Sequence, residues 1–221
     1  MYQPCFAVYI ALATKETRMS IEIKIEDSSK LTEYAEIPMA FTVGRVLAVR
    51  DLGFGGISLE KQEVDPPYTK DYDACPTEGP LTWAKRWDLS NWAFFAAFFE
   101  NQRVGGAALA WDTPDVHMLE GRKDLAVLWD IRIHPEHQGK GLGRLLFKAA
   151  EKWAISKGCI FLKVETQNIN VPACRFYQKQ GCSLGAINRF AYPDLPDEVC
   201  LLWYKDLANK TMHADADKPR R

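Results

Sequence analysis

The 221-residue sequence predicts a single α+β or α/β-type domain, built on a mixed sheet of six or seven strands that is flanked by helices. Stretches with strand periodicity outnumber those with helical periodicity, and the two kinds follow one another in mixed order. The sequence contains no internal repeat or low-complexity tract. A hydrophobic content of 47% and a charged content of 26% are ordinary for a globular chain that buries a sizeable core.

The first predicted element is a half-buried strand in which Ile21, Ile23 and Ile25 alternate with charged residues. We expect residues 1–18 to be a disordered extension, 19–207 to form the domain and 208–221 to be a disordered tail. The apolar run at 5–13 is far shorter than the ~20 residues of a membrane span, and it lacks the features of a signal peptide. No membrane partner is therefore expected.

Ser28 or Ser29 is expected to cap a helix that runs to about Ile37, where Pro38 ends the helical pattern. Glycine and proline then recur from Val49 to Ser90. Such punctuation is typical of long functional loops, so this stretch is predicted to form a loop surface that contacts a substrate.

The middle of the chain predicts an antiparallel hairpin from residues 92–100 and 103–111. Residues 125–133 follow as a central strand, apolar in both alternating phases except at Asp130. Apolar residues at helical spacing then predict a helix over 141–157 with Gly158 as its C-terminal stop.

The last predicted elements are a strand at 160–166, a helix at 172–180 ended by Gly181, and closing strands at 183–191 and 198–204.

The turn between the central strand and the long helix is rich in glycine and basic residues. Glycines before a helix let the backbone approach a ligand closely, and the unpaired N–H groups of the first turn favour phosphate or pyrophosphate. Lys140 and Arg144 add positive charge. The P-loop pattern is excluded because no Gly-Lys-Ser/Thr follows at the required spacing, and the dinucleotide fingerprint is excluded because leucine replaces its third small residue.

Two motifs resemble those of the GNAT superfamily of N-acetyltransferases. Residues 138–143 read Gln-Gly-Lys-Gly-Leu-Gly, which matches the pyrophosphate loop Arg/Gln-x-x-Gly-x-Gly/Ala of that family. Residues 170–181 add an Asn-x-x-Ala-x-x-x-Tyr-x-Lys-x-Gly pattern after the intervening helix and strand. The resemblance covers residues 125–181 and implies a GNAT-like fold with acetyl-CoA as the acetyl donor.

The resemblance also implies roles for individual residues. The strand backbone at Ile131, Arg132 and Ile133 would pair with the pantetheine arm. The other implied cofactor-binding residues are Gln138, Gly139, Lys140, Gly141, Leu142, Gly143, Arg144, Asn170, Ala173 and Tyr177. The alternative is that the glycines only shape a strand-to-helix turn.

Tyr177 is the candidate acid, because the resemblance places it where GNAT enzymes carry a tyrosine near the cofactor sulfur, and a phenol with an ordinary pKa of about 10 can protonate the departing thiolate. The alternative is a core aromatic beside Phe176.

Asp130 is the candidate base, because a carboxylate in a central strand is costly unless it is hydrogen-bonded or meets a cation. It would receive the amine proton, directly or through water, or bind the substrate ammonium. An ion pair with Arg132 or another arginine is the alternative, and Glu165 is the reserve base.

The segments 164–174, 197–199 and 202–204 resemble streptothricin acetyltransferases, which implies a small cationic amine as the acceptor. Residues 60–73 carry a formal charge of about −3, which suits such an amine. Aromatic residues nearby would supply cation–π contacts or simply cover the core; they are Tyr68, Tyr72, Trp83 and Trp87. Two alternative functions are also considered: acetylation of a protein or peptide amine, and binding of acyl-CoA by a regulator without catalysis.

The charge and the cysteines limit the partners further. A net charge of −1 provides no field for nucleic acid, so a small-molecule partner is expected, with a homodimer considered. The six cysteines form no CxxC pair and the four histidines do not complete a zinc site. We expect reduced cysteines in a cytoplasmic protein and no metal.

Overall fold

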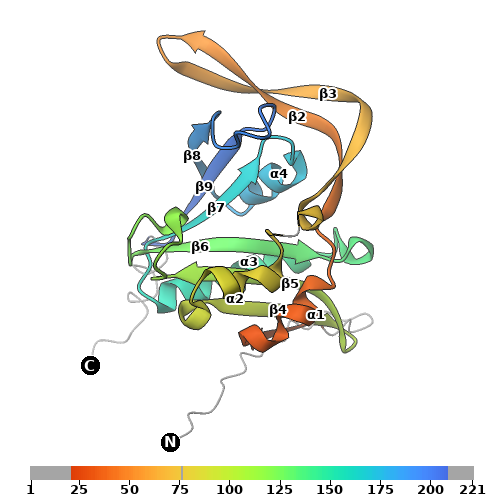
Figure 1. Cartoon of the computed structure of the whole chain (residues 1–221), viewed down its shortest axis with the longest axis vertical. Helices are drawn as coiled ribbons and strands as arrows, with labels where there is room; N and C mark the ends of the chain where they lie inside the picture. Colours follow the sequence, from red (N-terminus) through yellow and green to blue (C-terminus); the bar gives the residue numbers. More distant parts are fainter. Residues whose placement is uncertain (1–20, 76, 209–221) are drawn as a thin grey trace, which may run out of the picture. The chain divides into compact units, whose positions relative to one another are not determined.

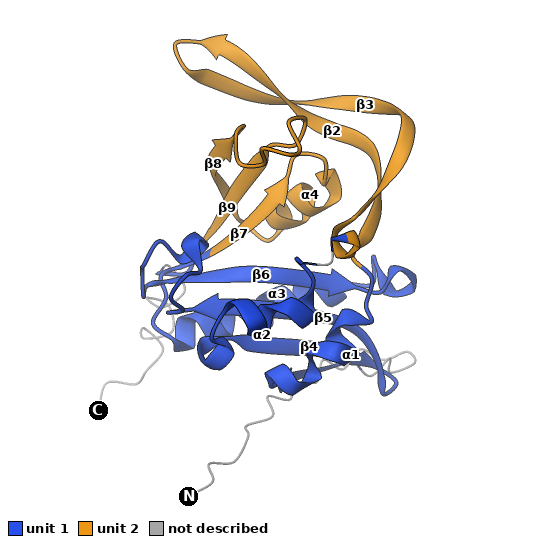
Figure 2. Ribbon diagram, viewed as in Figure 1, with its two compact units in different colours: residues 1–38, 75–162, 207–221 blue, residues 39–74, 163–206 orange. Residues whose placement is uncertain are grey.

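The computed structural model describes residues 21–75 and 77–208, and Figure 1 shows the elements in chain order. These residues divide into two compact units that are discontinuous in sequence (Figure 2). The first contains the described residues of 1–38, 75–162 and 207–221, and the second contains 39–74 and 163–206. The disorder expected at 1–18 and across 209–221 lies outside the described residues.

The predicted fold class is confirmed, because the main sheet has seven strands in the order β1-β4-β5-β6-β7-β9-β8, with β2 and β3 in a separate two-stranded sheet. The strands are β1 (Ile21–Glu26), β2 (Ala40–Gly53), β3 (Gly56–Asp71), β4 (Ala93–Phe99), β5 (Gln102–Trp111), β6 (Leu125–Ile133), β7 (Phe161–Gln167), β8 (Ser183–Asn188) and β9 (Cys200–Asp206). The helices are α1 (Leu31–Ala35), α2 (Pro80–Arg86), α3 (Leu142–Ser156) and α4 (Val171–Lys179). None of the helices in the described ranges is long and apolar enough to cross a bilayer.

In the first unit, β1, β4, β5 and β6 pair with one another as antiparallel neighbours. The predicted β4–β5 hairpin is confirmed. Its turn holds Glu100 and Asn101 at φ values of 49° and 66°, the left-handed pair that tight hairpins prefer.

The predicted cap of the first helix is wrong by one residue. Asp27, rather than Ser28 or Ser29, accepts the backbone N–H of Ser29 at 2.8 Å. Asp27 thereby caps a 3-10 turn (Ser28–Lys30), and α1 follows this turn without a side-chain cap of its own. A carboxylate is the stronger acceptor for these N–H groups, and its charge suits a helix N-terminus.

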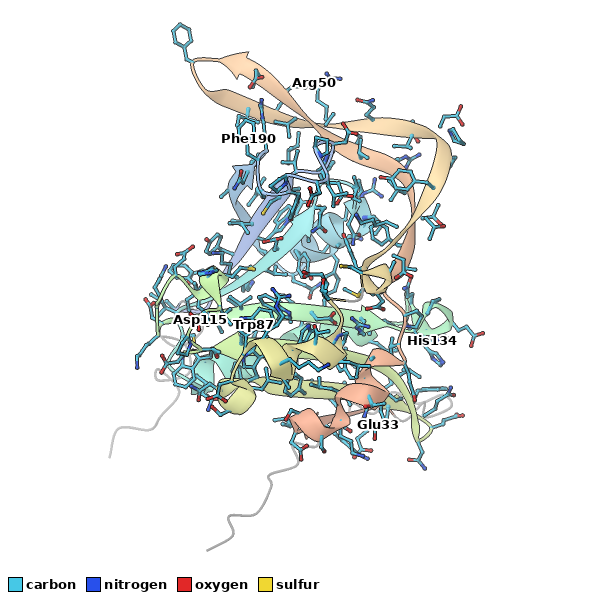
Figure 3. The ribbon with its side chains drawn as sticks, viewed as in Figure 1. Glu33, Arg50, Trp87, Asp115, His134 and Phe190 are labelled. Carbon is cyan, nitrogen blue, oxygen red and sulfur yellow. The ribbon has the colours of Figure 1, made fainter. Side chains whose placement is uncertain are left out.

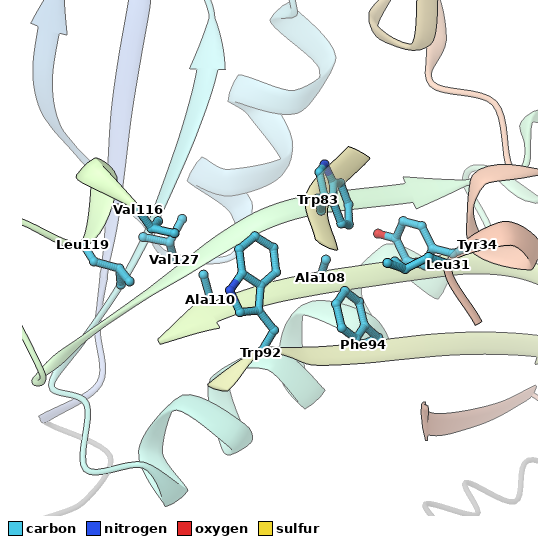
Figure 4. Close-up of a cluster of buried hydrophobic side chains, with 10 residues drawn as sticks. All are labelled: Leu31, Tyr34, Trp83, Trp92, Phe94, Ala108, Ala110, Val116, Leu119 and Val127. Atoms are coloured by element: carbon cyan, nitrogen blue, oxygen red, sulfur yellow. The ribbon is translucent and has the colours of Figure 1, made fainter. Parts of the chain in front are cut away.

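Aromatic side chains from α1, α2 and β4 build one core cluster of the first unit (Figure 4). Trp83 is 2% exposed and its ring stacks on Phe94, with a centroid distance of 6.4 Å. Trp87 packs edge-on against Trp129 at 4.8 Å, and its indole N–H donates to the carbonyl of Asp115 (Figure 3). Of the two roles considered for these aromatic residues, cation–π contacts or covering the core, Trp83 and Trp87 have the second.

Strand β6 contains a bulge that the alternation pattern does not predict. Ala108 pairs with Asp130 but the next residue, Leu109, pairs with Leu128, so Trp129 is the extra residue. A bulge shifts the side-chain phase of the strand beyond it. In a regular strand, residues three positions apart point to opposite faces. Because of the bulge, Val127 packs in the same cluster as Tyr34, and Asp130 accepts a hydrogen bond from the Tyr34 hydroxyl.

The second unit corrects the prediction of a long loop after Val49. Residues 40–71 form a long antiparallel hairpin, β2–β3, closed by a turn in which Gly53, Phe54 and Gly55 have positive φ. Val43 pairs with Tyr68 while Arg45 pairs with Glu63, so residues 64–67 face Gly44 alone. Pro66 and Pro67, two of the prolines that suggested a loop, lie within this break, where no ladder hydrogen bond is lost.

Asn168 ties the hairpin to the rest of the second unit. Its side-chain amide donates to Leu47 O at 3.1 Å, and Leu47 N donates back to its carbonyl at 2.9 Å. Its side-chain oxygen accepts Val199 N at 2.8 Å. Because Asn168 is 4% exposed, water does not compete for these bonds.

The strand and helix predictions for the remainder hold with small shifts. Strand β7 begins one residue later than expected, α4 begins one residue earlier, and β8 ends at Asn188 rather than at residue 191. Gly158 and Gly181, at φ values of 79° and 77°, lie just beyond α3 and α4 as the expected stops.

Candidate active site

The glycine-rich turn connects β6 to α3 in the first unit. After a 3-10 turn (Pro135–His137), Gly139 and Gly141 take φ values of 75° and 85°. Gly141 is the residue before α3, and a β-carbon built on it meets no atom within 4 Å. The backbone at this point is therefore both left-handed and open, which only glycine accommodates without strain.

The turn is accessible and positively charged. Gln138, Lys140 and Arg144 are exposed, and no side chain caps α3 at Gly141. The N–H groups of the first helical turn, which in the sequence begins Leu142-Gly143, can therefore face a ligand. This combination fits a pyrophosphate.

Gln138 also has a structural contact, because its side-chain amide donates to Ile133 O at 3.2 Å. This bond closes the turn onto the end of β6. Along that strand Ile131 and Ile133 are half-buried, whereas Arg132 between them is 4% exposed.

Asp130 lies in a buried ion pair with Arg132 and is 9% exposed. Its Oδ2 accepts the Arg132 Nη2 at 2.7 Å, and its Oδ1 accepts the Arg132 Nε at 3.0 Å. The Tyr34 hydroxyl donates to the same Oδ1 at 2.6 Å, and Arg132 Nη1 donates to Ile37 O at 2.8 Å. The alternative of an ion pair with Arg132 is thus what the structure shows.

Tyr34 is suited to this role as a donor. Burial raises the pKa of its phenol, and the Asp130 carboxylate raises that pKa further. The hydroxyl therefore stays protonated and keeps Asp130 Oδ1 occupied. With both carboxylate oxygens engaged, Asp130 offers little to a substrate proton.

Tyr177 lies on α4 in the second unit and is 4% exposed. Its ring packs edge-on against Phe176 with a centroid distance of 5.2 Å. Asn170, predicted to bind the cofactor, caps α4 by accepting Ala173 N at 3.1 Å. The capping bond sets the start of the helix that carries Tyr177.

A hydrogen-bonded cluster on β7 includes a residue that the sequence analysis missed. Tyr192 donates to Glu165 Oε1 at 2.6 Å and accepts from Gln167 Nε2 at 3.0 Å, and Gln167 accepts from the Tyr72 hydroxyl. Burial, and then the Glu165 carboxylate, raise the pKa of Tyr192. The one sequence signal was the polar pair Glu165 and Gln167, two residues apart on one strand face.

The predicted site residues thus fall into two groups. The glycine-rich turn and Asp130 belong to the first unit, and Asn170, Ala173 and Tyr177 belong to the second, with Glu165. Among residues 21–75 and 77–208, no group of three or more His, Cys, Asp or Glu is arranged to hold a metal ion.

Comparisons with known proteins agree with this geometry. The model of the acetyltransferase (GNAT) family matches residues 59–182, more than half of the chain. A streptothricin acetyltransferase from Escherichia coli is 32% identical over 154 residues, which cover 67% of this chain and 76% of that protein. Streptothricin acetyltransferase A from Bacillus subtilis (strain 168) is 35% identical over 114 residues, which cover 51% and 61%.

A solved structure extends the likeness to the fold. A protein from Bacillus anthracis str. Ames, assigned as a streptothricin acetyltransferase and crystallised in complex with acetyl coenzyme A, superposes with a TM-score of 0.66. It is 25% identical, and the match covers 85% of this chain and 99% of that one. The chain therefore belongs to the acetyltransferase (GNAT) family, and it is an N-acetyltransferase that takes its acetyl group from acetyl-CoA.

Proposed function

We propose that the acceptor is a small polycationic amine of the streptothricin kind, so that the enzyme confers resistance to that antibiotic. The observation that carries the proposal is the identity of 32% to a streptothricin acetyltransferase over 76% of its length. The resemblance of residues 164–174, 197–199 and 202–204 to the same group supports it.

The acidic residues of 60–73 support the proposal less than their charge suggests. Cross-strand arginines neutralise two of them, because Arg45 pairs with Glu63 at 2.6 Å and Arg50 with Glu60 at 3.4 Å. Lys70 pairs with Glu198. We therefore expect the cationic acceptor to bind carboxylates that are not already paired with these arginines or with Lys70.

In the proposed mechanism the turn from Gln138 to Arg144 holds the pyrophosphate, and the backbone of Ile131 to Ile133 pairs with the pantetheine arm. The amine nitrogen attacks the thioester carbonyl carbon and the carbon–sulfur bond breaks. The departing thiolate needs a proton, and we propose that the Tyr177 phenol donates it. The amine needs a proton acceptor.

We assign that proton acceptor to Glu165 rather than to Asp130. Asp130 is engaged by Arg132 and Tyr34 through both oxygens, whereas Glu165 is half-buried and bonds Tyr192 through Oε1. Its second oxygen is the better place for an amine proton. Asp130 then acts as a positioning residue for β6.

Gly141→Val is expected to abolish measurable binding of CoA. A branched side chain is strained at a φ of 85°, and its atoms would enter the space left for the phosphates. Calorimetry with CoA measures this directly. Gly121→Val is the control, because Gly121 also has a positive φ and open space but lies outside the turn. Wild-type CoA affinity in Gly141→Val would remove the phosphate site from this turn.

Glu165→Gln and Asp130→Asn are expected to fail in different ways. Glu165→Gln should lower kcat/KM for the amine most at low pH, and the loss should shrink as the pH approaches the amine pKa of about 10, where a base is no longer needed. Asp130→Asn should instead lower the free energy of unfolding by about 3–5 kcal/mol, because Arg132 stays buried without its counter-charge.

Thermal unfolding and pH–rate profiles of both variants test this assignment. A normal melting temperature for Asp130→Asn, together with a rate loss that grows at low pH, would return the base role to Asp130.

Tyr177→Phe is expected to lower kcat by roughly 100-fold while CoA affinity stays close to wild type, because only the proton donor is lost. Single-turnover kinetics that isolate the chemical step provide the measurement. The control is Phe176→Leu, which disturbs the neighbouring ring but removes no hydroxyl. An unchanged chemical step in Tyr177→Phe would leave this residue a core aromatic.

The acceptor itself is tested by thiol release from acetyl-CoA with streptothricin, aminoglycosides, polyamines and peptide amines, and by expression in a sensitive bacterium. Streptothricin is expected to be the best acceptor, and expression is expected to raise the inhibitory concentration of streptothricin. Efficient turnover of a peptide with none of streptothricin would make the enzyme a peptide N-acetyltransferase instead.

The proposal also includes a cytoplasmic location and a small molecule, not nucleic acid, as the partner. The described cysteines are all free thiols, four of them buried, which suits a reducing compartment. A homodimer stays a prediction.

A further inference from the structure

A cavity of about 520 Å³ lies within the second unit, under the β2–β3 hairpin. One wall is the hairpin face that carries Val46, Ala48 and Val64, and Ile169 and Val199 contribute apolar surface from outside the hairpin. The volume falls in the range of sites that hold small ligands, roughly 300–1,000 Å³. This apolar part of the lining suits methylene groups, and Gln62, Asn168, Arg189 and Asp197 add polar groups to it.

The walls are fixed before any ligand binds. Asn168 bonds both Leu47 of the hairpin and Val199 near the start of β9. Lys70 of β3 pairs with Glu198, and both side chains are mostly buried, with relative exposures of 19% and 10%. A cavity held open by such bonds costs little to organise on binding.

Most charged groups at or near the cavity are paired with each other, and Asp197 is the carboxylate that can meet a ligand. The Arg189 guanidinium donates to both oxygens of Asp51, at 2.6 and 3.2 Å, and is thereby neutralised. Glu198 is neutralised by Lys70. Asp197, which also lines the cavity, is exposed and has no ion pair among the described residues.

Tyr68 supplies an aromatic surface on the same wall and is 44% exposed. Its phenol is close to the acidic residues, because after burial the Glu198 and Asp197 carboxylates are the charges that raise its pKa. An aromatic ring beside a carboxylate is a common environment for an alkylammonium ion.

We propose that this cavity binds the aliphatic arm of the amine acceptor, and that Asp197 and Tyr68 hold an ammonium group on that arm. This inference rests on the proposed function and specifies the substrate class: an acceptor with a second ammonium separated from the reacting amine by a flexible methylene chain. Asp197 and Tyr68 are specificity residues and take no part in acetyl transfer.

The test compares Asp197→Asn and Ala48→Phe with the matched control Asp194→Asn, an exposed aspartate of the same loop outside the cavity lining. In Asp197→Asn the KM for streptothricin is expected to rise about fivefold, which is typical of a partly exposed ion pair, with kcat and the KM for acetyl-CoA unchanged. Ala48→Phe fills the cavity and should raise the KM by more. Thermal unfolding checks that both variants fold.

A second readout does not depend on turnover. Calorimetry with 1,5-diaminopentane and with pentylamine, which lacks the second ammonium, measures binding to the full chain. The diamine is expected to bind more tightly than the monoamine to the wild type and to Asp194→Asn, and this preference is expected to disappear in Asp197→Asn.

The outcomes separate the two hypotheses. Acetylation of streptothricin with an unchanged KM in Asp197→Asn and Ala48→Phe overturns the cavity assignment and leaves the proposed function standing. If the wild type does not acetylate streptothricin, the proposed function fails and the diamine experiment decides the cavity. An equal affinity for diamine and monoamine in the wild type would then overturn the site, and a preference that requires Asp197 would support it.

Discussion

The buried ion pair between Asp130 and Arg132 is the constraint on which the first unit depends. Two charges out of water are tolerable only if each is paired and its remaining hydrogen-bonding groups are satisfied. Here Tyr34 and the carbonyl of Ile37 complete the pair, so α1 and the segment after it are held against β6. Gly106 belongs to the same arrangement, because a β-carbon there would lie 2.4 Å from the Tyr34 ring. The strand fixed in this way leads directly into the glycine-rich turn.

The second unit is organised by a different device. A two-stranded hairpin has too little packing to be stable in water by itself, so β2–β3 needs an anchor. Asn168 provides one through side-chain and backbone hydrogen bonds to Leu47 and Val199, and the Lys70–Glu198 pair provides another. Both anchors are hydrogen-bonded polar groups that are largely buried, so they fix the position of the hairpin. The cavity beneath the hairpin is lined by Asn168 and Val199 of the first anchor and by Val46 and Ala48 on either side of Leu47.

The sequence predicts best the features that local rules determine. Helix α3 follows from its apolar spacing and its flanking glycines, and the central strand from its continuous apolar run. The hairpin was missed because Pro66 and Pro67 look like loop residues unless the break opposite Gly44 is known. The partner Tyr34 lies 96 residues from Asp130, and Tyr192 lies 27 residues from Glu165, so no local pattern joins either pair. The glycine-rich turn and both candidate carboxylates could thus be named from the sequence, whereas the contacts that distinguish Asp130 from Glu165 could not.

A carboxylate in a central strand has two physical explanations, and its neighbours decide between them. A base needs an oxygen that an amine proton can reach, whereas a structural carboxylate has its oxygens occupied by donors that do not leave. The donors on Asp130 are a guanidinium, which stays charged at any relevant pH, and a phenol whose pKa is raised. Glu165 is half-buried, its Oε1 accepts the Tyr192 phenol, and the Cys200 thiol lies nearby, so no guanidinium bonds it in the way that Arg132 bonds Asp130. The carboxylate that interrupts the central strand is therefore held by its neighbours, and the base role that we propose for Glu165 lies on β7, a strand that alternation alone does not single out.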